Sequence, residues 1–129
     1  MQVSVSRPRS VLASFVSLIC LLMCLGLSAQ AQRYSYARDI VARAQEDLRR
    51  AASFTRESKG ERERYEKAQK HLSEFDRSLT RGKFDGGKLN DVIDDVKDIV
   101  EHNTLAAGDR DALTQDLHDL RDLKSHHEK

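Results

Sequence analysis

The spacing of apolar residues between Tyr34 and Thr55 constrains the fold more than any other feature of the chain. Apolar and small side chains recur there at alternating steps of three and four residues, so they share one stripe along about six turns of an α-helix. The stripe consists of Tyr34, Ala37, Val41, Ala44, Leu48, Ala51 and Thr55, with Ile40 and Phe54 beside it. Charged residues fill the positions between. This pattern predicts an amphipathic helix whose apolar side needs a partner.

Three later segments repeat the helical spacing and supply such partners. The second stripe again follows steps of three and four, the third is the widest and most apolar, and the fourth is built from leucines. Their members are Tyr65, Ala68, Leu72, Phe75 and Leu79; Leu89, Val92, Ile93, Val96, Ile99 and Val100; and Leu113, Leu117, Leu120 and Leu123. No segment alternates with the period of two that is typical of a strand. We therefore predict an all-α fold, either a small four-helix bundle or two packed helical hairpins, with helices at about 34–57, 61–81, 87–102 and 109–124.

Glycines mark the breaks between these helices. Gly60 suits the left-handed residue that ends many helices, and the second stripe is out of phase with the first, which favours two helices over one long helix. A lone glycine costs a helix only about 1 kcal/mol, so the long helix is kept as an alternative. The glycine-rich segment 82–87 is the main break, with Asp85 as a candidate N-cap for the third helix and Phe84 as a hydrophobic staple. Residues 125–129 are expected to fray.

Residues 1–31 have the pattern of a secretory signal peptide rather than of a folded domain. A basic start is followed by an apolar run over residues 11–27, and Ala29 and Ala31 form the A-x-A pattern that signal peptidase recognises. We predict cleavage after Ala31, which leaves residues 32–129 as a single all-helical domain. The protein is then exported, either to the periplasm or as a secreted protein, which fits a bacterial source.

Two other interpretations of this segment stay open. The apolar run is close to the minimum length for spanning a bilayer, so an uncleaved membrane anchor is one alternative. A lipid anchor on Cys24 is another, although Met23 lies where a lipoprotein signal has a small residue. Cys20 and Cys24 are the two cysteines of the chain. Cleavage therefore leaves a domain that has neither a disulfide nor a thiol nucleophile.

Charge is divided unequally between the two halves of the expected domain. Residues 32–81 contain 13 basic and 9 acidic side chains, and residues 82–129 contain 7 basic and 12 acidic ones. The simplest interpretation is that the basic and acidic hairpins attract each other and dock within one molecule. Head-to-tail self-association, or a separate partner on each face, is the alternative, but charges more than about 10 Å apart are screened at ordinary salt.

The third helix carries four aspartates that the helical spacing places on one ridge opposite the apolar side. They are Asp91, Asp94, Asp95 and Asp98. Four carboxylates within two turns repel one another and can attract a basic partner or a divalent cation. A calcium site needs six or more converging oxygens, which one straight helix does not supply. The ridge is therefore interpreted first as a solvated face, second as a protein-interaction ridge and last as a metal site.

The histidines do not form a recognised zinc motif. His118 and Asp122 are one helical turn apart and can hold zinc only weakly, and no H-E-x-x-H sequence or cysteine of the mature domain adds ligands. His71 lies beside the second stripe and fits a half-buried packing role. The run from His71 to Glu74 has the residue types of a catalytic triad, but adjacent residues on a helix point in different directions. We predict no metal site, no cofactor and no enzymatic activity.

Composition also argues against nucleic acid and membrane partners. Nine acidic residues interrupt the arginines of the first hairpin, so no continuous basic stripe forms, and the same acids weaken membrane contact after signal cleavage. Tyr34 and Tyr36 follow the predicted cleavage site, and paired aromatic rings can anchor a protein partner. We therefore expect an exported, non-catalytic helical protein that acts as a protein–protein interaction or self-associating module. The alternative is a periplasmic carrier of a ligand or metal ion that uses the acidic ridge and the histidines.

Overall fold

The computed structural model describes residues 34–54 and 58–129, which form four α-helices. Helix α2 spans Ser35–Phe54, α3 spans Lys59–Thr80, α4 spans Gly86–His102 and α5 spans Ala107–His127. No strand occurs in these two ranges. The predicted all-α class is thus confirmed for the described part of the chain, and each predicted helix has a counterpart.

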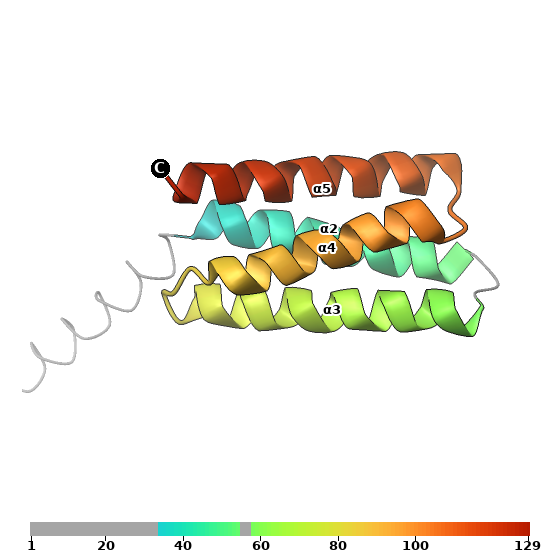
Figure 1. Cartoon of the computed structure of the whole chain (residues 1–129), viewed down its shortest axis with the longest axis horizontal. Helices are drawn as coiled ribbons and strands as arrows, with labels where there is room; N and C mark the ends of the chain where they lie inside the picture. Colours follow the sequence, from blue (N-terminus) through green and yellow to red (C-terminus); the bar gives the residue numbers. More distant parts are fainter. Residues whose placement is uncertain (1–33, 55–57) are drawn as a thin grey trace, which may run out of the picture.

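The helices form a bundle in which each helix runs antiparallel to the next (Figure 1). Helix α3 packs on α2 and α4, and α5 packs on α4 and closes the bundle against α2. The start of α2, the turn between α3 and α4, and the C-terminus all lie at one end of the bundle, while the connection between α4 and α5 lies at the other (Figure 1). The two predicted hairpins are therefore halves of one up-and-down bundle.

The predicted stripes form the core. Nineteen hydrophobic residues are buried in one cluster that draws side chains from all four helices. In α3 and α4 these side chains follow the predicted stripes, and Phe75 is the largest that is fully buried. Burying one side chain of the size of leucine or phenylalanine contributes about 1.5–3 kcal/mol to stability. The core residues are Ala37, Ile40, Val41, Ala44, Leu48, Ala51, Tyr65, Ala68, Leu72, Phe75, Leu79, Leu89, Val92, Ile93, Val96, Ile99, Leu113, Leu117 and Leu120.

Helix α3 begins two residues before the predicted start because Ser58 caps it. The Ser58 hydroxyl accepts a hydrogen bond from the Glu61 amide at 3.3 Å, and the Glu61 carboxylate accepts one from the Ser58 amide at 3.0 Å. This capping box gives partners to two amides that a helix start leaves unpaired. The prediction that Gly60 ends a helix in a left-handed conformation is wrong: Gly60 lies inside α3, and Gly82 is the one described glycine with positive φ.

The turn between α3 and α4 is where the chain needs a glycine. Gly82 has a φ of 75°, its amide donates to the carbonyl of Leu79 at 2.9 Å, and the next amide donates to the carbonyl of Ser78 at 3.0 Å. This pair of bonds is the Schellman arrangement that ends a helix, and a side chain at residue 82 would be strained. Asp85 then caps α4 as predicted, since its carboxylate accepts a hydrogen bond from the Lys88 amide at 3.1 Å.

Phe84, the predicted staple, holds together the end of the bundle that contains this turn. Its ring meets Phe75 edge to face with 5.5 Å between centroids and lies 6.1 Å from the ring of Tyr34. The ring of His127 stacks on it at 3.6 Å. This contact accounts for the helical conformation of α5 as far as His127. Helix α5 therefore extends three residues beyond its predicted end at 124, into the segment that was expected to fray.

The basic first half and the acidic second half of the domain form ion pairs with each other within one molecule. Ion pairs join basic residues of α2 and α3 to aspartates of α4 and α5. These pairs are Arg43–Asp116, Arg43–Asp119, Arg50–Asp109, Arg64–Asp98, Lys67–Asp95 and His71–Asp95. The interpretation that the basic and acidic hairpins dock within one molecule is supported by every one of these contacts.

Several predictions about the N-terminal part fall outside the described residues. They concern the signal peptide of residues 1–31 with its cleavage after Ala31, and the stripe positions occupied by Thr55 and the side chain of Phe54. Among the four described helices, none combines the length and the apolar character that crossing a bilayer requires.

Candidate functional site

The four aspartates of the predicted ridge do not share one face. Asp91 and Asp94 are exposed, whereas Asp95 is only 6% exposed and lies against α3. Its carboxylate is 3.2 Å from Nζ of Lys67 and 2.5 Å from Nδ1 of His71. The prediction of a ridge opposite the apolar side is therefore wrong for Asp95, which joins α4 to α3.

The helical spacing explains this position of Asp95. It follows Val92 by three residues and precedes Ile99 by four, and both of these are fully buried. The wide apolar side of α4 therefore extends to Asp95, and α3 covers it with basic side chains. Asp98, one turn further, is half-buried and pairs with Arg64 of α3 at 3.4 Å. Two of the four ridge carboxylates are thus neutralised within the bundle.

A shallow hollow of about 310 Å³ lies over this part of α3 and α4. Its lining is of mixed charge and consists of Lys67, Asp94, Asp95, Lys97, Asp98 and Glu101. Lys97 also lies 3.9 Å from Glu101, one turn along α4. The negative charge that is left for a basic partner is therefore smaller than the sequence suggested, and it is concentrated on Asp91 and Asp94.

The residue types of a triad between His71 and Glu74 are not brought together. His71 is half-buried, as predicted, and is held by Asp95. The Ser73 hydroxyl donates to the carbonyl of Gln69 at 2.9 Å and accepts a hydrogen bond from Gln45 at 3.3 Å. The ion pair of His71 was missed from the sequence, although Lys67 and His71, one turn apart on α3, are spaced to meet one carboxylate.

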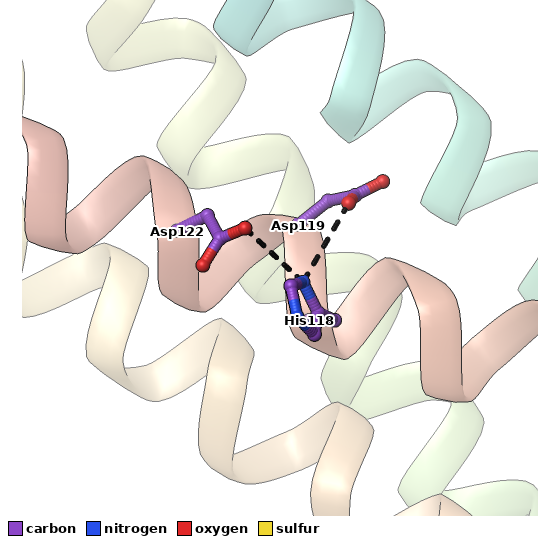
Figure 2. A group of neighbouring side chains, drawn as sticks. All are labelled: His118, Asp119 and Asp122. Carbon is purple, nitrogen blue, oxygen red and sulfur yellow. Dashed lines mark ion pairs between the residues drawn. The ribbon is translucent and has the colours of Figure 1, made fainter.

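A group of three candidate metal ligands lies on α5 (Figure 2). Nδ1 of His118 is 3.1 Å from Oδ2 of Asp122 and 4.0 Å from Oδ1 of Asp119. The His118 side chain is 67% exposed, and Asp119 already binds Arg43 and Gln115. A cation here would gain one imidazole and one unshared carboxylate from a single helix. Such a set can bind a divalent ion only weakly, as the spacing of His118 and Asp122 predicts.

Buried charge is concentrated where α5 packs on α2. Three aspartates are buried at this contact, two from α5 and one from α2. Arginines of α2 hold them, and a fourth aspartate lies at the edge. We call this set the α2–α5 seam; it consists of Arg43, Asp47, Arg50, Asp109, Asp116 and Asp119. None of the sequence patterns described above predicted this seam.

Each arginine of the seam bridges two carboxylates. Nε of Arg43 donates to Oδ1 of Asp116 at 2.9 Å, and its terminal nitrogen binds Asp119. Arg50 makes the second bridge, to Asp47 at 2.6 Å and to Asp109 at 3.3 Å. These charge-assisted bonds fix the register of α5 against α2.

Asp116 is the residue of the seam whose ionisation is most altered. It is 0% exposed. Burial raises its pKa from 3.8 to about 6; Arg43 lowers this pKa, whereas the neighbouring Asp47 raises it. Its Oδ2 atom is buried and has no hydrogen-bond partner among the described residues.

A different kind of surface lies nearer the end of the bundle, also across α2 and α5. Tyr36 is 69% exposed, more than any other large hydrophobic side chain that the structure describes. A hollow of about 280 Å³ beside it has a mainly apolar lining. We call this the Tyr36 surface; it consists of Tyr36, Asp122, Leu123 and His126. A third hollow, of about 310 Å³ between α2 and α3, has a largely polar lining that includes Arg38, Asp39 and Asp76.

Comparison of the chain with family models, with curated proteins and with solved structures finds no match. The geometry of the described residues is therefore the basis for assigning a function.

Proposed function

We propose that this protein is a non-catalytic helical module of an exported compartment, which binds another protein or a second copy of itself through the Tyr36 surface. The observation that carries the proposal is the exposure of Tyr36, a residue that is 69% exposed beside a mainly apolar hollow. Covering such a ring removes apolar area from water, and a few aromatic anchors supply much of the binding energy in protein interfaces.

The distribution of charge favours this surface over the predicted acidic ridge. On the ridge, Asp95 and Asp98 are held by basic side chains of α3. On the Tyr36 surface, Asp122 lies beside the apolar hollow and pairs with the exposed His118. An apolar centre with a carboxylate at its rim fits a partner segment in which an apolar side chain is followed by a lysine or arginine. Export is supported by the pattern of residues 1–31.

The proposal is tested by crosslinking in the native cells. A photo-reactive amino acid replaces His126, inside the hollow, and a control probe replaces Lys70, which is exposed on α3. We expect one defined adduct from residue 126, none from residue 70, and loss of the adduct when Tyr36→Ala is added. An adduct of twice the protomer mass indicates self-association, and any other mass indicates a foreign partner. Equal labelling from both positions, no labelling from residue 126, or an adduct that persists in Tyr36→Ala contradicts the proposal.

A second candidate function is a carrier of a divalent ion, which the convergence of His118, Asp119 and Asp122 favours. Calorimetric titration of the purified protein with Zn²⁺ decides this. Sub-micromolar binding that His118→Ala removes would support the carrier. Binding in the range of a weak surface pair, or binding that His118→Ala leaves unchanged, would leave the interaction module as the better proposal.

A further inference from the structure

The α2–α5 seam holds more carboxylates than cations. Its four aspartates share two arginines, and three of the four aspartates are buried. Two negative charges are therefore left without a cation of their own at a contact where Asp47, Asp109 and Asp116 are each at most 8% exposed. Buried charge of this kind is costly unless it is neutralised, and a carboxylate in this position can be neutralised by a proton.

The geometry shows where that proton belongs. Arg43 of α2 binds Asp116, and the buried Asp47 lies one turn further along α2 from Arg43, on the same side of the helix. Oδ1 of Asp116 accepts the hydrogen bond from Arg43, but Oδ2 is buried and has no donor among the described residues. Two ionised carboxylates are both acceptors, so they can form a hydrogen bond with each other only when one of them carries a proton.

We propose that Asp116 and Asp47 share one proton in the folded protein, and that release of this proton loosens α5 from α2. With the proton present, the two carboxyl groups form an O–H···O⁻ hydrogen bond across the contact. Without it, two like charges are buried side by side. The raised pKa of Asp116 has the direction that this arrangement requires, because burial and Asp47 together outweigh the opposing effect of Arg43.

The other elements packed against Asp116 offer no substitute for the proton. On α2 the charged groups that act on Asp116 are Arg43 and Asp47. On α5 itself, Asp119 competes for Arg43. The core side of α4 is apolar, and the basic side chains of α4 bind elsewhere: Lys88 to Ser78, Lys97 to Glu101 and His102 to Asp98.

The proton would also act on the Tyr36 surface, a consequence that depends on the proposed function. Tyr36 lies seven residues before Arg43 on α2, and Leu123 lies seven residues after Asp116 on α5. Seven residues are about two helical turns, and the helices are antiparallel, so both sides of the hollow extend from the seam toward the same end of the bundle (Figure 1). Loosening of the seam therefore separates the two sides of the surface. The proton-sharing pair itself does not depend on any partner.

The test is urea unfolding at pH 5, 6 and 7.5 of the purified wild-type protein and of Asp116→Asn. The matched control is Asp119→Asn, because Asp119 binds the same arginine, Arg43, but is not a member of the proposed proton-sharing pair. A folded pKa of about 6 against 3.8 in the unfolded chain makes the folding equilibrium constant about tenfold larger at pH 5 than at pH 7.5. We expect this change in wild type and in Asp119→Asn. In Asp116→Asn this tenfold change of the folding equilibrium constant should be absent, because the side-chain amide at residue 116 donates to Asp47 at every pH.

Comparison of wild type with Asp116→Asn separates Asp116 from the histidines, which as a residue type also titrate in this range. Hydrogen exchange of the α5 amides, normalised to the intrinsic rate at each pH, should show lower protection at pH 7.5 than at pH 5 in wild type. Carboxyl NMR titration of wild type provides an independent result if Asp116→Asn does not fold. Titration of Asp116 near 4, an equal pH-dependence in Asp116→Asn and wild type, or α5 protection that does not change with pH would overturn the proposal.

Discussion

The ring of His127 stacks on the ring of Phe84 with 3.6 Å between their centroids, so the end of α5 is held by the turn between α3 and α4. Phe84 also touches Phe75 in the core, which connects this contact to the packing of the whole bundle. Two residues that are 43 positions apart in the sequence therefore define one end of the molecule.

We predict that Phe84→Ala destabilises the protein by about 2–3 kcal/mol, because it removes a half-buried ring that touches three others. His127→Ala should cost about 1 kcal/mol or less and should unwind only the last turn of α5. Urea unfolding and amide exchange of the final turn measure the two effects. His126→Ala is the matched control, because His126 lies on the same turn but contacts the carbonyl of Asp122, whereas His127 stacks on Phe84. Equal effects of His126→Ala and His127→Ala on the last turn would contradict the role of the stack.

A second prediction concerns the aspartates of α4. Asp95→Ala should destabilise the protein by about 1–3 kcal/mol, because it leaves Lys67 and the half-buried His71 without their shared carboxylate. Asp94→Ala, one residue earlier and exposed, should change stability by no more than about 0.5 kcal/mol. Thermal or urea unfolding of the two variants provides the comparison. If both variants lose the same small amount, Asp95 belongs to a solvated ridge after all.

The sequence predicted most of the fold because helical periodicity depends on residues that are near one another in the chain. Asp85 as an N-cap and Phe84 as a packed ring were likewise readable from local patterns. Gly60 was misread because its own preference for a left-handed conformation was considered without the capping box of Ser58 and Glu61, which continues the helix through it. Because a glycine has no side chain, the backbone conformation of Gly60 is determined by the hydrogen bonds of its neighbours.

The buried charges could be predicted only in part, although their positions carried a signal. Asp116 follows Leu113 by three residues and precedes Leu120 by four, and Asp47 has the same relation to Ala44 and Ala51. Both aspartates therefore occupy buried sides of their helices, and this spacing could have identified them. That both aspartates lie in the α2–α5 seam depends on the register of α5 against α2, which no local pattern contains. The same limit applies to Asp95, whose partners are chosen by the packing of α3 on α4.

A third prediction tests how much the cation of the seam contributes. Arg43→Met should destabilise the protein by roughly 2–3 kcal/mol at pH 7.5, because it leaves the fully buried Asp116 without its guanidinium partner. The loss should be smaller at pH 5, where Asp116 is protonated, and smaller in the Asp116→Asn background. Arg38→Met is the control: its carboxylate partner Asp76 is 34% exposed, against 1% for the side chain of Asp116, so this pair should be worth less than about 1 kcal/mol. Equal losses of stability in Arg43→Met and Arg38→Met would show that the Arg43–Asp116 pair contributes no more than an ordinary surface ion pair.

The last prediction uses the opposite end of the bundle, where Glu61 links α3 to the connection between α4 and α5. Its carboxylate accepts hydrogen bonds from the amides of Thr104, at 2.6 Å, and of Ser58, at 3.0 Å. These bonds, that of Thr104 first, lower the pKa of Glu61 from 4.5 to about 2. Because the folded protein binds this proton more weakly than the unfolded chain, the stabilisation is complete above about pH 4.5 and is lost as the pH falls toward 2.

Glu61→Gln should therefore be less stable than wild type at pH 6, and the difference between the two should narrow steadily on acidification to pH 2.5. Urea midpoints at half-unit intervals of pH measure this narrowing. Glu63→Gln, two residues along α3, is the matched control, because its side chain is exposed and lies 3.8 Å from the exposed Lys59. Its difference from wild type should stay within about 0.5 kcal/mol throughout. The effect of Glu61 on stability changes below about pH 4.5, whereas that of Asp116 changes mainly between pH 7.5 and 5. The two carboxyl groups therefore act in opposite directions: acidification from pH 7.5 to 5 should strengthen the α2–α5 contact, and acidification below about pH 4.5 should weaken the bonds of Glu61 at the other end of the bundle.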